Sequence, residues 1–208
     1  DPLGFDMLTA QIAWSRSGTD TELRLNNVSI VNPHLAGTLS GVYRTVSDRR
    51  GVIDLTGKLT RADARFAGPY IPLVVGKATR DWLDTAFLAG QSTDVALRVK
   101  GNLDHFPFPN NKGGVFQVVA KVTGGIVDYA QNWPKIENLS GDLVFRGQSM
   151  EINARRGTIL GAQLANVRAE IPDLKHHDEL LRVTGEAEGA TSEFLAFIES
   201  DRYNASLP

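Results

Sequence analysis

The chain has 208 residues and a formal net charge of -2 at pH 7, because Lys and Arg are almost balanced by Asp and Glu. It therefore lacks the excess of positive charge that favours a nucleic-acid partner. It contains no cysteine, which excludes disulfides, thiolate metal sites and a cysteine nucleophile. No apolar run approaches the roughly 18 residues of a membrane-spanning helix, and the chain begins without Met or a signal peptide. We expect it to be part of a longer protein whose membrane anchor lies outside it.

Apolar residues on every second position predict β-strands near the start of the chain, because a strand points successive side chains to opposite faces. Before residue 69 we expect four strands, at 9–14, 22–31, 35–43 and 52–59. In the second of them the alternation shifts between Leu25 and Val28, which predicts a β-bulge near Asn26-Asn27.

The alternation stops at residues 69–76, and a first helix is expected at about 78–89. Its apolar residues recur at helical spacing and form one stripe, made of Trp82, Leu83, Ala86 and Phe87. Gly90 is well placed to end this helix. We therefore predict a short amphipathic helix between two groups of strands.

Strands resume after this helix and continue to residue 187. We expect them at 93–101, 115–123, 125–130, 139–146, 149–155, 162–171 and 180–187. Gly124-Gly125 is predicted to be a turn, and two prolines exclude a ladder strand from the loop 102–114. A second helix is expected at about 191–199, with one apolar stripe made of Phe194, Leu195 and Ile198.

Together these segments predict a mainly β fold of roughly 11 to 13 strands, joined by tight turns into a long meandering antiparallel sheet, with two short amphipathic helices. Three regions are distinguished: an N-terminal β segment at 1–68, an irregular stretch and helix at 69–92, and a C-terminal β segment with the terminal helix at 93–208. The two β segments are either separate or parts of one continuous sheet. One face of the sheet is apolar, so it is covered either by a second sheet or by something that is not protein.

Residues that could support catalysis or metal binding have no recognisable arrangement. Most of the histidines lie in turn-like segments, so no metal site is expected. Gly76-Lys77 lacks the glycine spacing and the following Ser or Thr of a phosphate-binding loop, and Asp81 and Asp84 are typical of an exposed helix flank. A carboxylate-based glycosidase would need two acids about 5–10 Å apart in a cleft, and no such pair stands out. We therefore predict no enzymatic activity, no cofactor and no metal.

Several short motifs follow one another between residues 70 and 174. They are Tyr70-Ile71-Pro72, Trp82-Leu83-Asp84-Thr85-Ala86, Gly101-Asn102-Leu103-Asp104-His105-Phe106-Pro107-Phe108, Gly114-Val115-Phe116, and the stretches 128–136, 139–145 and 169–174. They resemble the YhdP-type members of the AsmA-like family, and the resemblance covers about residues 9–200. Its most specific part is the Phe-Pro-Phe loop followed by Asn-Trp-Pro.

The resemblance implies an internal, periplasmic segment of a long protein of Gram-negative bacteria, tethered to the inner membrane outside this segment. Such proteins are similar to bridge-like lipid transfer proteins, in which a curved sheet forms a trough with a hydrophobic floor. They are implicated in moving phospholipid between the inner and outer membranes, and so in outer-membrane biogenesis. The family implies no catalytic residues for this chain.

Two functional hypotheses follow from the apolar face. In the first, the sheet curves into a trough and phospholipid acyl chains lie on side chains that alternate along the strands. We expect these side chains to be Leu97, Val99, Phe116, Val118, Val122, Leu143, Phe145, Ile152, Leu164, Val167, Leu181 and Val183. In the second, the chain is a closed β-sandwich of the cell envelope that binds a protein or glycan through loops 102–114 and 131–138. The first hypothesis predicts an uncovered apolar surface that binds lipid, with other envelope proteins as further partners.

Overall fold

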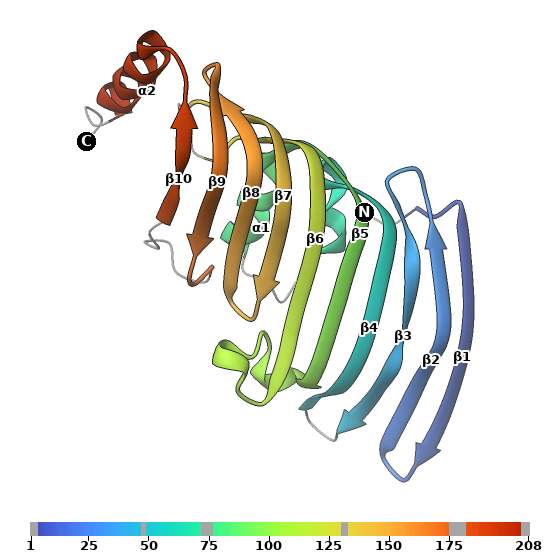
Figure 1. Cartoon of the computed structure of the whole chain (residues 1–208). Helices are drawn as coiled ribbons and strands as arrows, with labels where there is room; N and C mark the ends of the chain where they lie inside the picture. The colour runs from blue at the N-terminus through green and yellow to red at the C-terminus, as the bar shows by residue number, and fades with distance from the viewer. Residues whose placement is uncertain (1–3, 47–48, 72–76, 130–132, 175–181, 205–208) are drawn as a thin grey trace.

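In the computed structural model, the described residues are 4–46, 49–71, 77–129, 133–174 and 182–204. They form one antiparallel sheet of ten strands whose order in space is their order in the sequence (Figure 1). The strands are β1 (Met7–Ser17), β2 (Asp20–Val31), β3 (Leu35–Val46), β4 (Arg49–Asp63), β5 (Phe87–Asn102), β6 (Gly114–Val127), β7 (Ile136–Arg146), β8 (Ser149–Ile159), β9 (Ala162–Ile171) and β10 (Arg182–Glu188). The predicted mainly β, meandering antiparallel sheet is confirmed.

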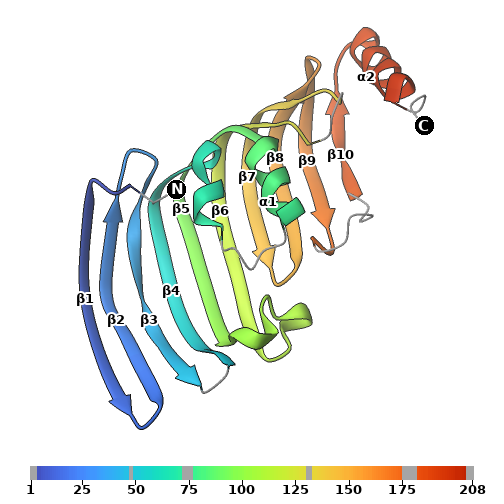
Figure 2. The same cartoon turned by 180° about the vertical axis from the view of Figure 1, so that it is seen from behind.

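Helices account for little of the chain and lie at the ends of strands. Two are α-helices, α1 (Lys77–Ala86) and α2 (Thr191–Asn204). Four are short 3₁₀ turns, η1 (Ala64–Phe66), η2 (Gly68–Tyr70), η3 (Leu103–His105) and η4 (Pro109–Asn111). Seen from behind, α1, η1 and η2 all lie on the same side of the sheet (Figure 2).

The strand register explains why the sheet has two chemically different faces. One line of directly paired residues crosses all ten strands, and every member is apolar or glycine. The line is Leu8, Ile30, Gly37, Leu59, Val95, Ala120, Leu143, Ile152, Ala169 and Val183. Because side chains alternate along each strand, the residues two positions away continue the same face.

Two predictions about element boundaries are wrong. The first helix ends at Ala86, and Phe87 begins β5, so Gly90 lies inside a strand rather than at a helix end. Gly90 has a φ of +147°, which glycine adopts without strain. The predicted turn at Gly124-Gly125 is also wrong: β6 runs through it, and the register with β7 shifts between Val122 and Gly125. Two predicted strands, 115–123 and 125–130, are thus replaced by the single strand β6, which ends at Val127, and the described part of the chain has ten strands instead of 11 to 13.

Other local predictions are confirmed. The register of β2 with β3 shifts between Leu25 and Val28, as the change of parity predicted. The second helix is present and extends to Asn204. Its predicted apolar stripe is exposed, however, and α2 contacts the rest of the chain through other residues, including Phe197, whose ring lies 5.9 Å from that of Trp133.

The sheet is a single open layer, so the closed β-sandwich is wrong. The accessible surface of the chain is 12930 Å². A compact globular protein of 22.6 kDa would expose about 9,500 Å² by the usual scaling with mass. The excess is consistent with a sheet whose apolar face is only partly covered by the helices and loops at its margins.

Candidate functional site

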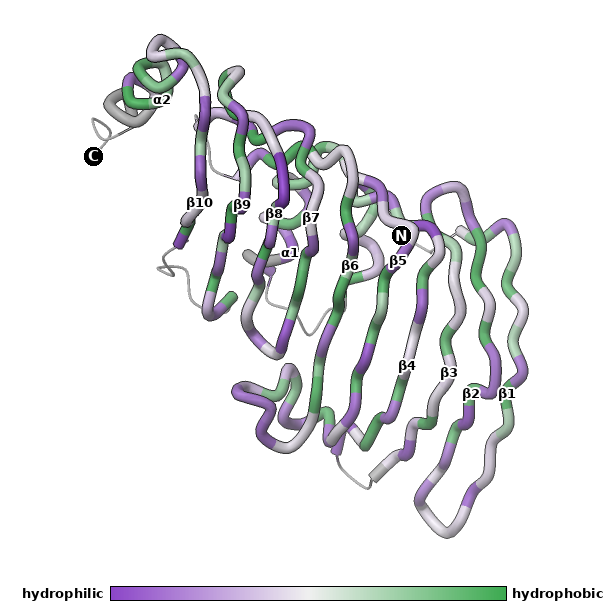
Figure 3. The backbone as a smooth tube through the Cα atoms, viewed as in Figure 1, coloured by the Kyte–Doolittle hydropathy of each residue, from purple (hydrophilic) through white to green (hydrophobic). Residues whose placement is uncertain are grey.

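We call the face that carries the line from Leu8 to Val183 the apolar face. Two further lines of paired residues run beside the first. One is Ala10, Val28, Leu39, Gly57, Leu97, Val118, Phe145, Met150 and Ile171, and the other is Ile12, Leu25, Gly41, Leu55, Val99 and Phe116. Figure 3 shows the resulting alternation of hydrophobic and hydrophilic positions along the strands. The three lines make a continuous hydrocarbon surface that runs across the strands.

The opposite face carries ion pairs within a strand and between neighbouring strands. Glu22 accepts from Arg24 and Arg44, and these contacts lower the pKa of its carboxyl. Arg98 lowers the pKa of Asp54 in the same way, and Lys121 lowers that of Asp94. These charged side chains lie on the face opposite the apolar face.

Glycines on the apolar face let neighbouring leucines lie flat. A Cβ placed on Gly37 would lie 2.6 Å from Leu59 Cδ2, and one placed on Gly57 would lie 2.5 Å from Leu39 Cδ2. Each leucine therefore covers a glycine on the next strand. This arrangement keeps the surface smooth and removes side-chain bulk from one face, which favours curvature toward that face.

Two segments fold over the apolar face from opposite ends of the strands. The first, called the upper cover, consists of residues 64–71 and 77–86 between β4 and β5, and it contains η1, η2 and α1. The second, called the lower loop, is residues 103–113 between β5 and β6. Because β5 joins them, the two segments approach the same central strands from opposite ends of the sheet (Figure 2).

The upper cover is seated on the sheet by aromatic residues. Trp82 donates a hydrogen bond from Nε1 to the backbone carbonyl of Tyr129 at 3.2 Å, and its ring meets that of Phe87 edge to face at 6.1 Å. Phe87 packs on a buried cluster made by Val127, Leu139 and Ala154. Burial also raises the pKa of the Tyr129 hydroxyl. The C-terminal end of α1 is therefore held at the margin of the apolar face.

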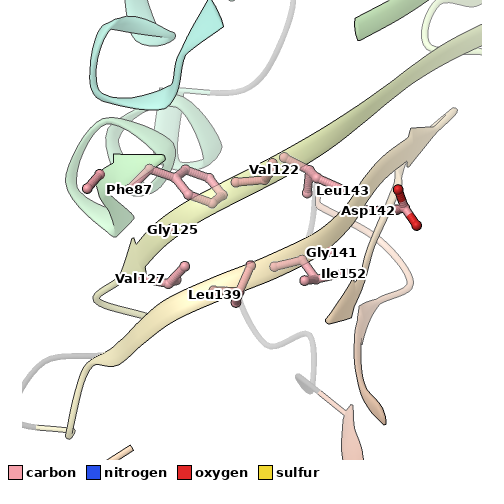
Figure 4. Close-up of a pocket in the computed structure, with 10 residues that line it drawn as sticks. Phe87, Val122, Gly125, Val127, Leu139, Gly141, Asp142, Leu143 and Ile152 are labelled. Carbon is pink, nitrogen blue, oxygen red and sulfur yellow. The ribbon is translucent and has the colours of Figure 1, made fainter. Parts of the chain in front are cut away.

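A small hollow lies beside Phe87 (Figure 4). It is lined mainly by apolar residues and glycines of β5 to β8, including Val122, Gly141, Leu143 and Ile152. Its free volume is about 10 Å³, close to the space of one water molecule. The hollow itself is therefore too small to hold an acyl chain.

The lower loop inserts phenylalanines at the other end of the strands. Phe108 is fully buried, and a Cβ on Gly101 or Gly114 would lie 2.8 or 2.5 Å from its ring. Phe106 lies beside it and places its ring 5.0 Å from that of Phe116 on the apolar face. The Phe-Pro-Phe segment of the resemblance motif thus forms the boundary of the apolar face at this end of the strands.

The structure places most of the predicted lining residues on the apolar face. The residues within its three lines are Leu97, Val99, Phe116, Val118, Leu143, Phe145, Ile152 and Val183. Val122 and Val167 belong to a further line, in register through Gly141 and Ala154. Leu164 lies beyond the positive-φ residue Asn166, in register with Gly157. Leu181 falls outside the described residues.

The sequence prediction named no lining residue before Leu97, although the same face continues over β1 to β4. The signal was present, since Leu23 and Leu25 alternate, as do Ile53, Leu55 and Leu59. Trp14 at the open edge is 73% exposed and is paired with Leu23. No pattern in the sequence predicted that Phe87 and Phe108 would border the apolar face. Their positions depend on how the β4–β5 and β5–β6 connections fold back over the sheet.

Among the described residues, no group of three or more His, Asp and Glu side chains lies close enough to hold a metal ion. No helix in the described ranges has both the length and the apolar content to cross a bilayer. The features of the site are an apolar surface, aromatic residues at its margins and ion pairs on the opposite face of the sheet.

Comparison with known proteins identifies the family of this chain. The model of the family described as YhdP protein matches residues 1–207. The chain belongs to the YhdP family. It is 22% identical over 165 residues to a protein of Escherichia coli strain K12 named intermembrane phospholipid transporter YhdP, an alignment that covers 79% of this chain and 13% of that protein. This YhdP-family chain thus spans about an eighth of the length of its curated relative. No solved structure matches it.

Proposed function

We propose that this chain is a non-enzymatic segment of a periplasmic, bridge-like lipid transport protein that carries phospholipid between the inner and outer membranes. In this proposal acyl chains lie on the apolar face, and the parent protein is tethered to the inner membrane outside this segment. The observation that carries it is the unbroken apolar line across all ten strands of a single-layer sheet. The name of the Escherichia coli relative supports phospholipid as the cargo.

The dimensions of the surface support a conduit more than a single binding pocket. Neighbouring strands lie about 4.8 Å apart, so ten strands extend the apolar line by roughly 43 Å. Each CH₂ moved from water onto apolar surface gains about 0.8 kcal/mol. Because every residue of the line is apolar or glycine, this gain changes little as an acyl chain moves from one strand to the next. No position along the line therefore binds the acyl chain much more tightly than its neighbours.

The lower loop and upper cover define where the lipid lies. Phe106 and Phe108 close the floor at one end of the strands, and α1 with Phe87 closes it at the other. The middle positions around Leu97, Val118 and Leu143 remain for hydrocarbon. The loop 102–114 and the described residues 133–138, which the interaction hypothesis assigned to a protein or glycan, are then margins of the trough and surfaces for other envelope proteins.

A charge on the floor tests the proposal. Val118 lies between Leu97 and Phe145 on the apolar face, so Val118→Asp places a carboxylate where acyl chains would lie. We expect several-fold less phospholipid in organic extracts of the purified variant, measured by mass spectrometry, with an unchanged circular dichroism spectrum. Val115→Asp is the matched control, because Val115 is paired with Lys100 on the opposite face and should leave bound lipid unchanged.

The wild-type chain provides the decisive comparison. We expect stoichiometric phospholipid in its extract, above the level in an equal-sized soluble β protein purified from the same cells. A folded wild-type chain with no lipid above that level would contradict the proposal. Equal amounts of lipid retained by Val118→Asp and Val115→Asp would contradict it too.

A further inference from the structure

Three basic residues of the upper cover have described side chains between Arg65 and Ala86, and two of them have acidic partners. Arg65 pairs with Asp63, and Lys77 pairs with Asp81 one helical turn away. Arg80 has no ion pair with any described residue, and its Nε atom is buried without a hydrogen-bond partner. A guanidinium carries five donors and stays charged, so an unmatched Nε is an unusual feature that calls for an explanation.

Arg80 lies where the buried side of α1 meets solvent. Leu83, one turn later, is buried, while Asp81 and Thr85 on the other side of the helix are exposed. Arg80 itself is half-buried. Asp84, four residues on, is directed toward η2, since a Cβ on Gly68 would collide with Asp84 Oδ1. The helix therefore places one cation at the boundary between the apolar face and water.

A buried donor without a partner costs free energy, and a hydrogen-bond acceptor such as an anion removes that cost. Guanidinium binds phosphate through two parallel hydrogen bonds, which gives stronger and more directional contacts than a lysine makes. Amphipathic helices at a lipid interface show the same arrangement, with apolar residues toward the acyl chains and basic residues at the level of the headgroups.

We propose that Arg80 binds the phosphodiester of a phospholipid whose acyl chains lie on the apolar face beside α1. This inference rests on the proposed function, and it adds a headgroup contact to a surface that otherwise recognises only hydrocarbon. It assigns the lipid an orientation across the trough, with the headgroup at the upper cover and the chains toward the middle of the strands. It also gives the segment a means to discriminate a phospholipid from a neutral diacylglycerol of the same chains.

The experiment compares two lipids that differ only in the headgroup. The 208-residue chain and its Arg80→Gln variant are incubated with phosphatidylcholine vesicles that contain either dioleoylphosphatidylglycerol or dioleoylglycerol, then separated from them and extracted for mass spectrometry. We expect the wild type to retain the phosphatidylglycerol in several-fold excess over the diacylglycerol. Arg80→Gln should lower retained phosphatidylglycerol by about tenfold, as one charge-assisted pair implies, and leave retained diacylglycerol unchanged.

Two controls separate a headgroup contact from a loss of charge or of structure. Lys77→Gln removes the same charge from the same helix and should leave the lipid ratio unchanged. Arg80→Lys keeps the charge without the fork and should give an intermediate ratio. Because Arg80→Gln removes an unsatisfied group, its thermal midpoint should equal or exceed that of the wild type, whereas a structural arginine would lower it.

The remaining outcomes separate a failure of the role given to Arg80 from a failure of the proposed function on which it rests. Equal retention of both lipids by the wild type and by Arg80→Gln would overturn the role of Arg80 and leave acyl-chain binding intact. A marked loss of thermal stability in Arg80→Gln would overturn it as well. Retention of neither lipid by a folded wild-type chain would overturn the proposed function itself.

Discussion

Asp63 is a buried carboxylate that holds the start of the upper cover. Its side chain accepts hydrogen bonds from the backbone and guanidinium of Arg65 and from the Gln91 amide on β5. The Arg65 contact lowers the pKa of Asp63, and burial opposes that shift. One residue thus joins the end of β4, the η1 turn and β5, and it determines where the connection leaves the sheet.

Asp63→Asn should therefore change how stability depends on pH. A carboxyl whose pKa is lower in the folded state stabilises the fold above its unfolded pKa, and this contribution is lost as the pH falls through the folded pKa. We expect the variant to be less stable by about 1–2 kcal/mol at pH 7, from loss of a cap and a charged hydrogen bond. The difference should shrink as the pH is lowered, measured by urea unfolding at several pH values.

Glu199→Gln serves as the control for this experiment, because Glu199 is exposed on α2 and no described contact depends on it. Its unfolding midpoint should track that of the wild type at every pH. A constant gap between wild type and Asp63→Asn from pH 7 down to the acid limit of folding would contradict the role given to Asp63.

At the scale of elements, the β7–β8 pairing is limited by how closely two backbones approach. Gly141 lies opposite Ala154, and a Cβ on it would collide with the backbone oxygen of Asn153. Neither backbone can move without breaking the ladder on its other side. Gly141 is thus needed for the register that aligns Leu143 with Ile152 on the apolar face.

We expect Gly141→Ala to destabilise the sheet by about 2–3 kcal/mol, the upper range for overpacking a tight site. Gly4→Ala is the matched control, since a Cβ there would have no atom within 4 Å. Chemical denaturation followed by circular dichroism measures both. Equal stability of the two variants would show that β7 and β8 can separate at this point, contrary to the close backbone approach at Gly141.

Sequence patterns predicted the elements well where the pattern was local and less well where two patterns overlapped. Alternation located the strands because parity follows directly from the pleat. Phe87 fits both a helical stripe and the alternation of β5, so the predicted helix ran one turn too far. Gly124-Gly125 has the composition of a turn, yet the strand continues through it as an irregularity. Only strand pairing distinguishes these cases: Phe87 pairs with Val127 of β6, and Gly125 pairs with Leu139 of β7.

The residues of the candidate site also differ in how far the sequence could predict their positions. The shared face of the proposed lining residues in the second half was predictable, because each position repeats the alternation of its own strand. The positions of Phe108 and Arg80 were not, since they depend on a loop and a helix that fold back over distant strands. Arg80 in particular has no distinctive neighbours in the sequence, and its buried Nε without a hydrogen-bond partner is evident only in the folded structure.

At the scale of the whole molecule, the sheet has two free edges. Every residue of β1 and of β10 is exposed, including Leu8, Ile12 and Trp14 on the apolar side of β1. An edge strand with unpaired backbone groups and apolar side chains is a template for another strand. A second copy paired along β1 would also continue the apolar lines across the junction, so backbone pairing and hydrocarbon burial favour the same contact.

The chain should accordingly self-associate as its concentration rises, and a charge on the edge should prevent it. We expect Ile12→Lys to stay monomeric at concentrations where the wild type forms larger species in sedimentation velocity runs, because an inward-pointing lysine opposes edge pairing. Gln11→Lys places the same charge on the opposite face of β1 and should reduce association less. If the wild type is monomeric throughout, the edge is protected by its own twist and bulge. If both lysine variants act equally, backbone pairing rather than the apolar face dominates the contact.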